Sequence, residues 1–181
     1  MKPTSESKPQ ILAETHYLQL VQDGHWTYAR RPNSIGAVGI VAVTDDQHLV
    51  LVEQHRIPVG GPVIELPAGL VGDDPVRREE SWEEAAGREL LEETGYEAGR
   101  LERLVDGVSS AGLTDEWVHL IRAFQLKRQH AGGGVENESI IVHTVPLTEV
   151  SNWLQVQRTG GKQVDFKVYA GLYFLLLDTQ S

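Results

Sequence analysis

The sequence contains no cysteine among its 181 residues. Disulfide bonds and thiolate metal sites are therefore excluded. Basic residues are also scarce, because 16 Lys and Arg stand against 26 Asp and Glu and give a formal net charge of -10. Non-specific binding to nucleic acid needs a basic surface, so we expect no nucleic-acid partner. A phosphate substrate is still compatible with this charge if a divalent cation neutralises its site locally.

Long hydrophobic runs are missing as well. The most apolar stretch near the end of the chain, residues 169–177, is too short to span a bilayer and contains Gly171. The polar residues 1–10 lack the apolar core of a signal peptide, and we expect them to form a disordered lead-in. We therefore predict a cytoplasmic protein with no membrane partner.

The remaining composition is that of an ordinary globular protein, with 40% hydrophobic and 23% charged residues. Two short extended segments flank the turn Asp23-Gly24, and the residues 45–47 between two β-rich runs indicate a hairpin. Strands are expected at 37–44, 48–53, 62–66, 101–108, 117–126 and 139–145. Helices are expected at 79–94, where Gly95 is the stop signal, after Pro146, and over about 164–177. This order predicts one α+β domain with a mixed sheet and helices packed on it.

The most informative segment is Arg88-Glu89-Leu90-Leu91-Glu92-Glu93-Thr94-Gly95-Tyr96. On a helix, Glu89 lies three residues before Glu92 and four before Glu93, so the three carboxylates share a face. Arg88 can pair with Glu92, but it cannot neutralise all three acids. Hard divalent cations such as Mg²⁺ or Mn²⁺ favour carboxylate oxygens, commonly together with substrate phosphates. An isolated acidic cluster is usually a solvated helix face, and it is the surrounding sequence that favours a metal site here.

Together with the residues upstream, this segment resembles the Nudix box, G-x5-E-x7-R-E-U-x-E-E-x-G-U, in which U is a bulky apolar residue. The matching residues are Glu80, Arg88, Glu89, Leu90, Glu92, Glu93 and Gly95, with Tyr96 in the last U place. One spacing differs, because Gly69 precedes Glu80 by eleven positions instead of six. A five-residue insertion within residues 70–79 explains this, with Gly69 keeping the role of the glycine, since loops tolerate insertions. Glu80 itself would touch a metal through water or cap the helix.

The resemblance extends over roughly residues 25–150 to the ADP-ribose and nucleotide-sugar pyrophosphatase branch of the Nudix hydrolases. It is carried by Leu51-Val52-Glu53-Gln54-His55-Arg56, Glu65-Leu66-Pro67-Ala68-Gly69 and Glu136-Asn137-Glu138-Ser139-Ile140. It implies a Nudix α/β/α sandwich over residues 36–181, preceded by strands within residues 11–35 that exchange between the subunits of a homodimer.

This branch implies hydrolysis of the diphosphate bond of a nucleoside diphosphate linked to a sugar, such as ADP-ribose, GDP-mannose or a UDP-sugar. The cofactor would be Mg²⁺, with Mn²⁺ as a substitute. ADP-ribose pyrophosphatases typically have a proline in the loop that corresponds to residues 109–116, and none is present here. The sequence therefore also favours other nucleotide sugars.

The resemblance assigns the metal-binding residues one by one. Glu89 and Glu93 would be metal ligands, and the backbone carbonyl of Ala68 would be a further ligand. Glu92 would be a ligand or its close support in catalysis. Arg88 would orient the carboxylates without touching the metal.

Three other residues would bind the substrate. Arg56 would hold the diphosphate or the terminal sugar. Trp26 and Arg31 would stack on the base and hydrogen-bond it, often from the second subunit. The plainer alternatives are a surface arginine at position 56 and a core tryptophan at position 26.

The catalytic base should be a carboxylate on a mobile loop within reach of the attacking water. The run Gly132-Gly133-Gly134-Val135-Glu136-Asn137-Glu138 suits this role, because three glycines allow the loop to move and two acids follow. The branch pattern favours Glu136 as the base and Glu138 as a support of the metal. The alternative is a flexible hairpin tip whose acids are solvated.

Two other functions stay open at this point. One is an enzyme of the same family that hydrolyses nucleoside triphosphates or dinucleoside polyphosphates. The other is a non-catalytic Nudix sensor that binds a nucleotide, although such a protein usually has lost box acids that are present here.

The two loop acids can be told apart by their metal dependence. Loss of a general base lowers kcat and leaves the metal dependence nearly unchanged, whereas loss of a ligand also raises the metal concentration needed for half activity. We expect the first result for Glu136→Gln and the second, more weakly, for Glu138→Gln, in parallel Mg²⁺ titrations. The reverse pattern would exchange the two roles. Two fully active variants would remove this loop from the chemistry and point to Asp115 or Glu116.

Overall fold

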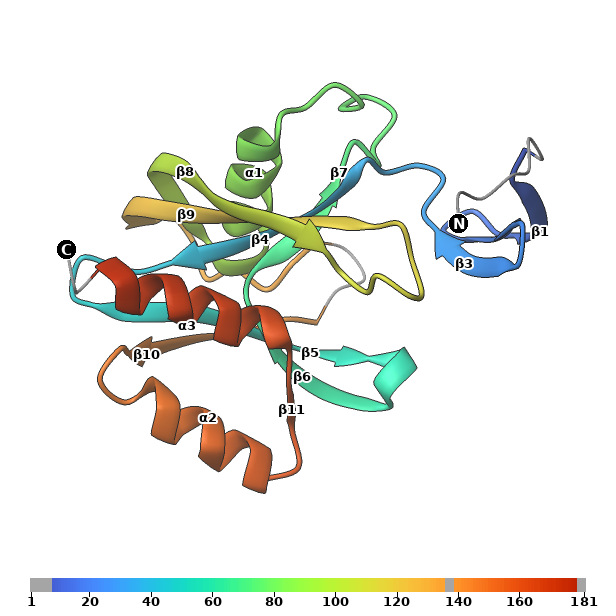
Figure 1. Ribbon diagram of the computed structural model, residues 1–181. Coiled ribbons are helices and arrows are strands. Elements are labelled where there is room, and N and C mark those ends of the chain that lie inside the picture. Colours follow the sequence, from blue (N-terminus) through green and yellow to red (C-terminus); the bar gives the residue numbers. More distant parts are fainter. Residues whose placement is uncertain (1–7, 136–138, 179–181) are drawn as a thin grey trace.

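The computed structural model describes residues 8–135 and 139–178, which form three sheets and three α-helices (Figure 1). The N-terminal sheet consists of β1 (Gln10–Glu14), β2 (Gln19–Asp23) and β3 (Trp26–Arg30). One central sheet has the order β7 (Ala68–Val71), β4 (Gly36–Ala42), β9 (Trp117–Arg128), β8 (Tyr96–Val108). The other has the order β10 (Ile141–Pro146), β5 (His48–Arg56), β6 (Gly61–Glu65), β11 (Gln163–Val164). A short 3-10 helix, Ile57–Val59, joins β5 to β6.

Both central sheets are mixed. The pairs β4–β9 and β6–β11 are parallel, and the other described pairs of these sheets are antiparallel. The expected α+β class with mixed pairing is confirmed. The single sheet predicted from the sequence is instead two, because the two strands joined by the turn at 45–47 share only the bridge between Val43 and Leu49 before they separate. Strand β4 then pairs with β7 and β9, whereas β5 pairs with β6 and β10.

The helices cover the sheets from two sides, as Figure 1 shows for α1 (Trp82–Thr94) on one side and α2 (Val150–Thr159) and α3 (Phe166–Asp178) on the other. Alternate residues of β4 pack toward the helices on opposite sides, because successive side chains of a strand point to opposite faces. Ile40 packs in the cluster that contains Leu90 of α1, while Val41 packs with Leu154 and Val168. Within the described residues, no helix is long and apolar enough to cross a membrane.

Helix α1 begins later than the sequence suggested, at Trp82. Ser81 is its N-cap, and the Ser81 hydroxyl accepts from the Glu84 backbone while the Glu84 carboxylate accepts from the Ser81 backbone. This reciprocal pair satisfies two backbone donors and defines the first turn. Gly95 ends the helix in the left-handed conformation with a φ of 74°, as predicted. The acidic face of α1 is thus fixed at both ends.

Strand β5 carries residues toward the functional site and is tied to its neighbours by Glu53. The Glu53 carboxylate is buried and accepts hydrogen bonds from His143 Nε2 and Lys162 Nζ, each at 2.8 Å. Burial raises the pKa of Glu53, but its bonds to Lys162 and His143 outweigh burial and the pKa lies below its ordinary value. The ionised carboxylate thereby joins β5 to β10 and to the segment before β11.

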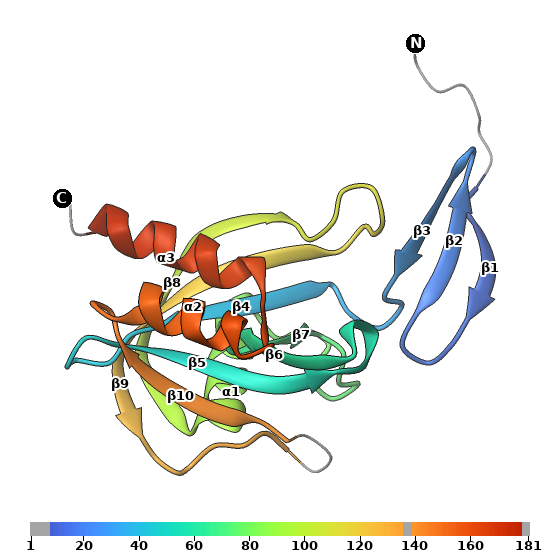
Figure 2. The ribbon, with the colours of Figure 1, turned by 90° about the horizontal axis from the view of Figure 1, so that it is seen from below.

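The N-terminal sheet stands apart from the rest of the molecule (Figures 1 and 2). It has three strands where the sequence suggested two extended segments. The described contacts to the main body include Ala29 N–H to the Leu113 carbonyl at 2.8 Å and the ion pair of Arg30 with Asp115 at 2.7 Å. Its exposed apolar side chains are Ile11, Leu12, Tyr17, Leu18, Leu20 and Trp26. The predicted lead-in lies mostly in residues 1–7, outside the described residues, and Gln10 already belongs to β1.

Candidate active site

A cleft of about 610 Å³ opens where β4, β5, β6 and β7 meet α1 and the start of α3. Its walls combine acids of α1 with cations from three other parts of the chain. The residues that matter for its chemistry are Arg31, Arg56, Ala68, Glu89, Glu93 and Lys167. Five of these six were singled out from the sequence, and the fold brings them to one place.

Two carboxylates of α1 face this cleft, one helical turn apart. Glu93 is 3% exposed and accepts a hydrogen bond from the Ala68 backbone N–H at 3.0 Å. Glu89 lies directly against the backbone of Gly69, so that a Cβ atom at position 69 would overlap its carboxylate carbon. A side chain at position 69 would force the Glu89 carboxylate to move, so Gly69 leaves room for its present orientation.

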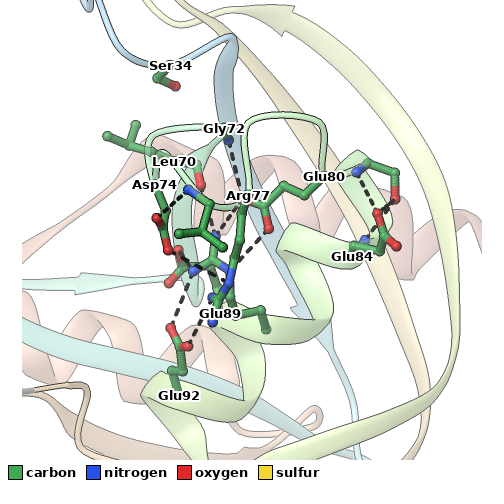
Figure 3. A network of polar contacts seen from close by, with 12 residues as sticks. Ser34, Leu70, Gly72, Asp74, Arg77, Glu80, Glu84, Glu89 and Glu92 are labelled. Atoms are coloured by element: carbon green, nitrogen blue, oxygen red, sulfur yellow. Dashed lines mark hydrogen bonds and ion pairs between the residues drawn. The ribbon is translucent and has the colours of Figure 1, made fainter.

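Arg88 is bonded to three acids, Glu80, Glu89 and Glu92, which Figure 3 labels. Its guanidinium contacts Glu80 at 2.9 and 3.2 Å, Glu89 at 2.7 Å and Glu92 at 3.3 Å. The contact with Glu92 is the i,i+4 pair expected from the sequence. Burial lowers the pKa of Arg88, but the hydrogen bonds and charges of Glu80 and Glu89 outweigh it and the pKa lies above its ordinary value.

Glu92 does not line the cleft. It lies in a neighbouring hollow of about 600 Å³ together with Arg77, Glu80 and Arg88. Among the residues that the structure describes, no three acidic or histidine side chains form a group that could hold a metal ion. The cleft wall thus contains two acids of α1, Glu89 and Glu93, and the role of Glu92 stays a prediction.

The cations of the cleft share one feature, which is that each is held by its own carboxylate. Lys167 was not singled out from the sequence, although it is the only charged residue of α3 before Asp178 and lies at the start of an otherwise apolar helix. The pairs are Arg31–Glu116 at 2.7 Å, Arg56–Glu65 at 2.8 Å and Lys167–Asp165 at 2.7 Å. Such pairing fixes the cations in place before any ligand arrives.

The other expected residues lie elsewhere. Trp26 is 54% exposed on the N-terminal sheet and is not part of the cleft wall of its own chain. Glu136 and Glu138 fall outside the described residues. The glycines before them dock on the end of α1, because Gly133 N–H donates to the Glu93 carbonyl at 2.8 Å and Gly134 N–H to the Glu92 carbonyl at 3.2 Å.

In a comparison with known protein families, residues 34–170 match the NUDIX domain. The acids on one helix beside a glycine of a strand agree with this match. The chain belongs to the Nudix family. A crystal structure titled ADP compounds hydrolase has the same fold, with a TM-score of 0.62, 26% identity and coverage of 84% of this chain and 86% of that one. The expected family and sandwich fold are confirmed.

Individual relatives of this Nudix chain are bacterial. A methanol dehydrogenase activator of Bacillus methanolicus is 36% identical over 126 residues, which are 68% of this chain and 64% of that protein. An ADP-ribose pyrophosphatase of Bacillus subtilis is 40% identical over 50% of this chain and 46% of its own length. A GDP-mannose pyrophosphatase of Citrobacter koseri is 34% identical over 69% and 65%. The chain thus spans less than two thirds of the length of these three relatives.

The structure also shows how the Nudix box tolerates its insertion. The added residues leave the strand after Gly69 and return so that Glu80 reaches Arg88, while the Glu80 carboxylate also accepts from the Gly72 backbone at 3.2 Å. Glu80 therefore does not cap the helix, which was one of its two expected roles, because Ser81 is the cap. Its side chain is 7% exposed and serves as the anchor of Arg88.

The close approach at Gly69 can be tested by Gly69→Ala. The added methyl group must push the Glu89 carboxylate away from β7, so we expect activity to fall at least ~10-fold. We expect little change in stability, because the end of the Glu89 side chain can move. Gly107→Ala is the matched control, because a Cβ at position 107 meets nothing within 4 Å. Kinetics with urea unfolding of both variants gives the comparison. Equal activity of the two variants would show that the position of Glu89 does not matter.

Proposed function

We propose that this protein hydrolyses the diphosphate bond of a nucleoside diphosphate linked to a sugar, giving a nucleoside monophosphate and a sugar phosphate. The observation that carries the proposal is one cleft that holds both the Nudix-box acids Glu89 and Glu93 and three fixed cations. Carboxylates alone would repel a diphosphate, and cations alone would bind it without activating water. The names of the relatives from Bacillus subtilis and Citrobacter koseri support this substrate class.

A divalent metal ion, which we propose to be Mg²⁺ with Mn²⁺ as a substitute, fits the donors present. Glu89 and Glu93 provide hard carboxylate oxygens, and the Ala68 carbonyl at the edge of the cleft is a further oxygen donor. The missing side chain at Gly69 leaves the Glu89 carboxylate room against the strand. Bound there, such an ion would neutralise phosphate oxygens and make water a stronger nucleophile.

The chain's own residues supply positioning and charge. Arg88 holds the Glu89 carboxylate by a bond of 2.7 Å and thereby keeps it from turning into solvent. Arg56 and Lys167, which line the same cleft as the two acids, bind phosphate or sugar oxygens. Because each of these cations is already paired with a carboxylate, little side-chain entropy is lost when the substrate binds. Glu136 as general base, with Glu138 in support, completes the proposal.

Arg31 and Trp26 are proposed to bind the base of the nucleotide, and the role of Trp26 requires a homodimer. Arg31 lies in the cleft of its own chain, whereas Trp26 does not. We propose a homodimer in which the unit of residues 11–35 packs on the 36–181 domain of the partner and brings Trp26 to the partner's cleft. The exposed apolar side chains within residues 11–26 support this, since burying them in an interface is favourable.

Sedimentation equilibrium at micromolar concentration tests the assembly. We expect twice the mass of the 20.1 kDa chain, and Leu20→Glu, on the exposed side of β2, should shift the protein toward monomer. Leu177→Glu is a control on an exposed part of α3. A monomer with full activity would contradict both the assembly and the role of Trp26.

The function itself is tested by phosphate release from a substrate panel, coupled to a phosphatase. The panel contains ADP-ribose, GDP-mannose, UDP-sugars, nucleoside triphosphates and dinucleoside polyphosphates, each with Mg²⁺, with Mn²⁺ and with excess chelator. We expect turnover of a nucleotide sugar that chelator abolishes. Preference for triphosphates or dinucleoside polyphosphates would replace the substrate class, and nucleotide binding without turnover would identify a sensor.

Glu93→Gln isolates the metal site within this assay. The change keeps the volume and removes one charge from the cleft, so we expect kcat to fall at least ~100-fold, or about 2.7 kcal/mol, with the fold intact. Glu149→Gln is the same chemical change at an exposed position whose side chain makes no cap bond, and it should behave as the unmodified protein. Near-normal turnover of Glu93→Gln at saturating Mg²⁺ would place the chemistry elsewhere.

A further inference from the structure

The five-residue insertion does more than bridge a gap, because residues 70–79 fold back against α1. Gly72 N–H is bonded to the Glu80 carboxylate at 3.2 Å, and Glu80 N–H to the Arg77 carbonyl at 3.0 Å. Arg77 N–H in turn donates to the Asp74 carbonyl at 2.9 Å. These bonds give the insertion loop a defined shape and direct one of its side chains at the helix.

That side chain is Arg77. Its guanidinium lies between Asp74 of the same loop, at 3.9 Å, and Glu92 Oε1 of α1, at 3.7 Å (Figure 3). Arg77 and Glu92 line the neighbouring hollow and not the cleft.

Glu92 is the acid whose position needs an explanation. Its spacing from Glu89 puts the two on one helix face, yet only Glu89 reaches the cleft. Both compete for the same donor, Arg88 Nη1, which contacts Glu89 at 2.7 Å and Glu92 at 3.3 Å. Arg88 alone therefore holds Glu92 with the longer bond, and Arg77 contacts its other oxygen from outside.

We propose that Arg77 is a positioning residue that keeps Glu92 on the outer side of α1, so that Glu89 and Glu93 are the acids facing the cleft. The inference rests on the proposed function, because it describes how the metal site of that function is composed. A half-exposed ion pair of this length is weak and screened by salt. A weak pair is sufficient here, because it has only to decide between two rotamers of one side chain on the same helix.

Manganese binding without substrate measures the effect, using the electron paramagnetic resonance signal of free Mn²⁺. Arg77→Gln releases Glu92 toward the cleft and removes a positive charge, so we expect Mn²⁺ to bind roughly threefold to tenfold more tightly. Arg78→Gln removes a charge from the next, exposed residue and is the matched control. Arg77→Lys keeps the charge and should stay near the unmodified protein. Thermal unfolding of each variant shows that the fold is intact.

A double-mutant cycle with Glu92→Gln decides whether Arg77 acts through Glu92. We expect the effect of Arg77→Gln to disappear when Glu92 has been replaced. Equal effects in both backgrounds, or equal Mn²⁺ affinity of Arg77→Gln and Arg78→Gln, would overturn the inference and leave the proposed function standing. Absence of Mn²⁺ binding by the unmodified protein would overturn both.

Discussion

The structure depends on one partly buried guanidinium. Arg88 is 17% exposed and is surrounded by the carboxylates of Glu80, Glu89 and Glu92. A helix that places several acids within one turn is destabilised by their repulsion, and a buried charge is costly unless it is paired. Arg88 reduces both costs. Its positive charge weakens the repulsion between the carboxylates, and the carboxylates stabilise the charge of the guanidinium in its partly buried position. The contact also joins the end of the insertion loop, through Glu80, to the face of α1.

The backbone around this network is adapted to it. Gly69 leaves room for the Glu89 carboxylate beside β7, and the Ala68 N–H donates a hydrogen bond to Glu93. Strand β7 thus contacts both acids of the cleft. At the far end of α1, the N–H groups of Gly133 and Gly134 satisfy carbonyls that the helix leaves unpaired. Gly133 and Gly134 are thereby attached to the C-terminal end of α1.

Local patterns predicted the parts of the fold that local physics controls. Helix α1, its stop at Gly95 and most strands follow from spacing, capping and turn residues. The short strands β7 and β11 were not predicted, because each is too short for a pattern and exists through pairing with strands far away in the sequence. The division into two central sheets escaped prediction for the same reason. Lys167 was missed because a single charge on an apolar helix has no motif around it.

The sequence by itself determined the family, the acids of the box, the glycine at position 69 and the five-residue insertion, because these are matters of identity and spacing. Only the tertiary structure decided which acids face the cleft and which cations join them. Helical spacing treats Glu89 and Glu92 alike, but their environments differ. Glu89 meets a strand that lacks a side chain at Gly69, whereas Glu92 meets Arg77 from the insertion loop. A side chain turns toward its neighbours in space, and Gly69 and Arg77, which distinguish the surroundings of the two acids, lie on other segments of the chain.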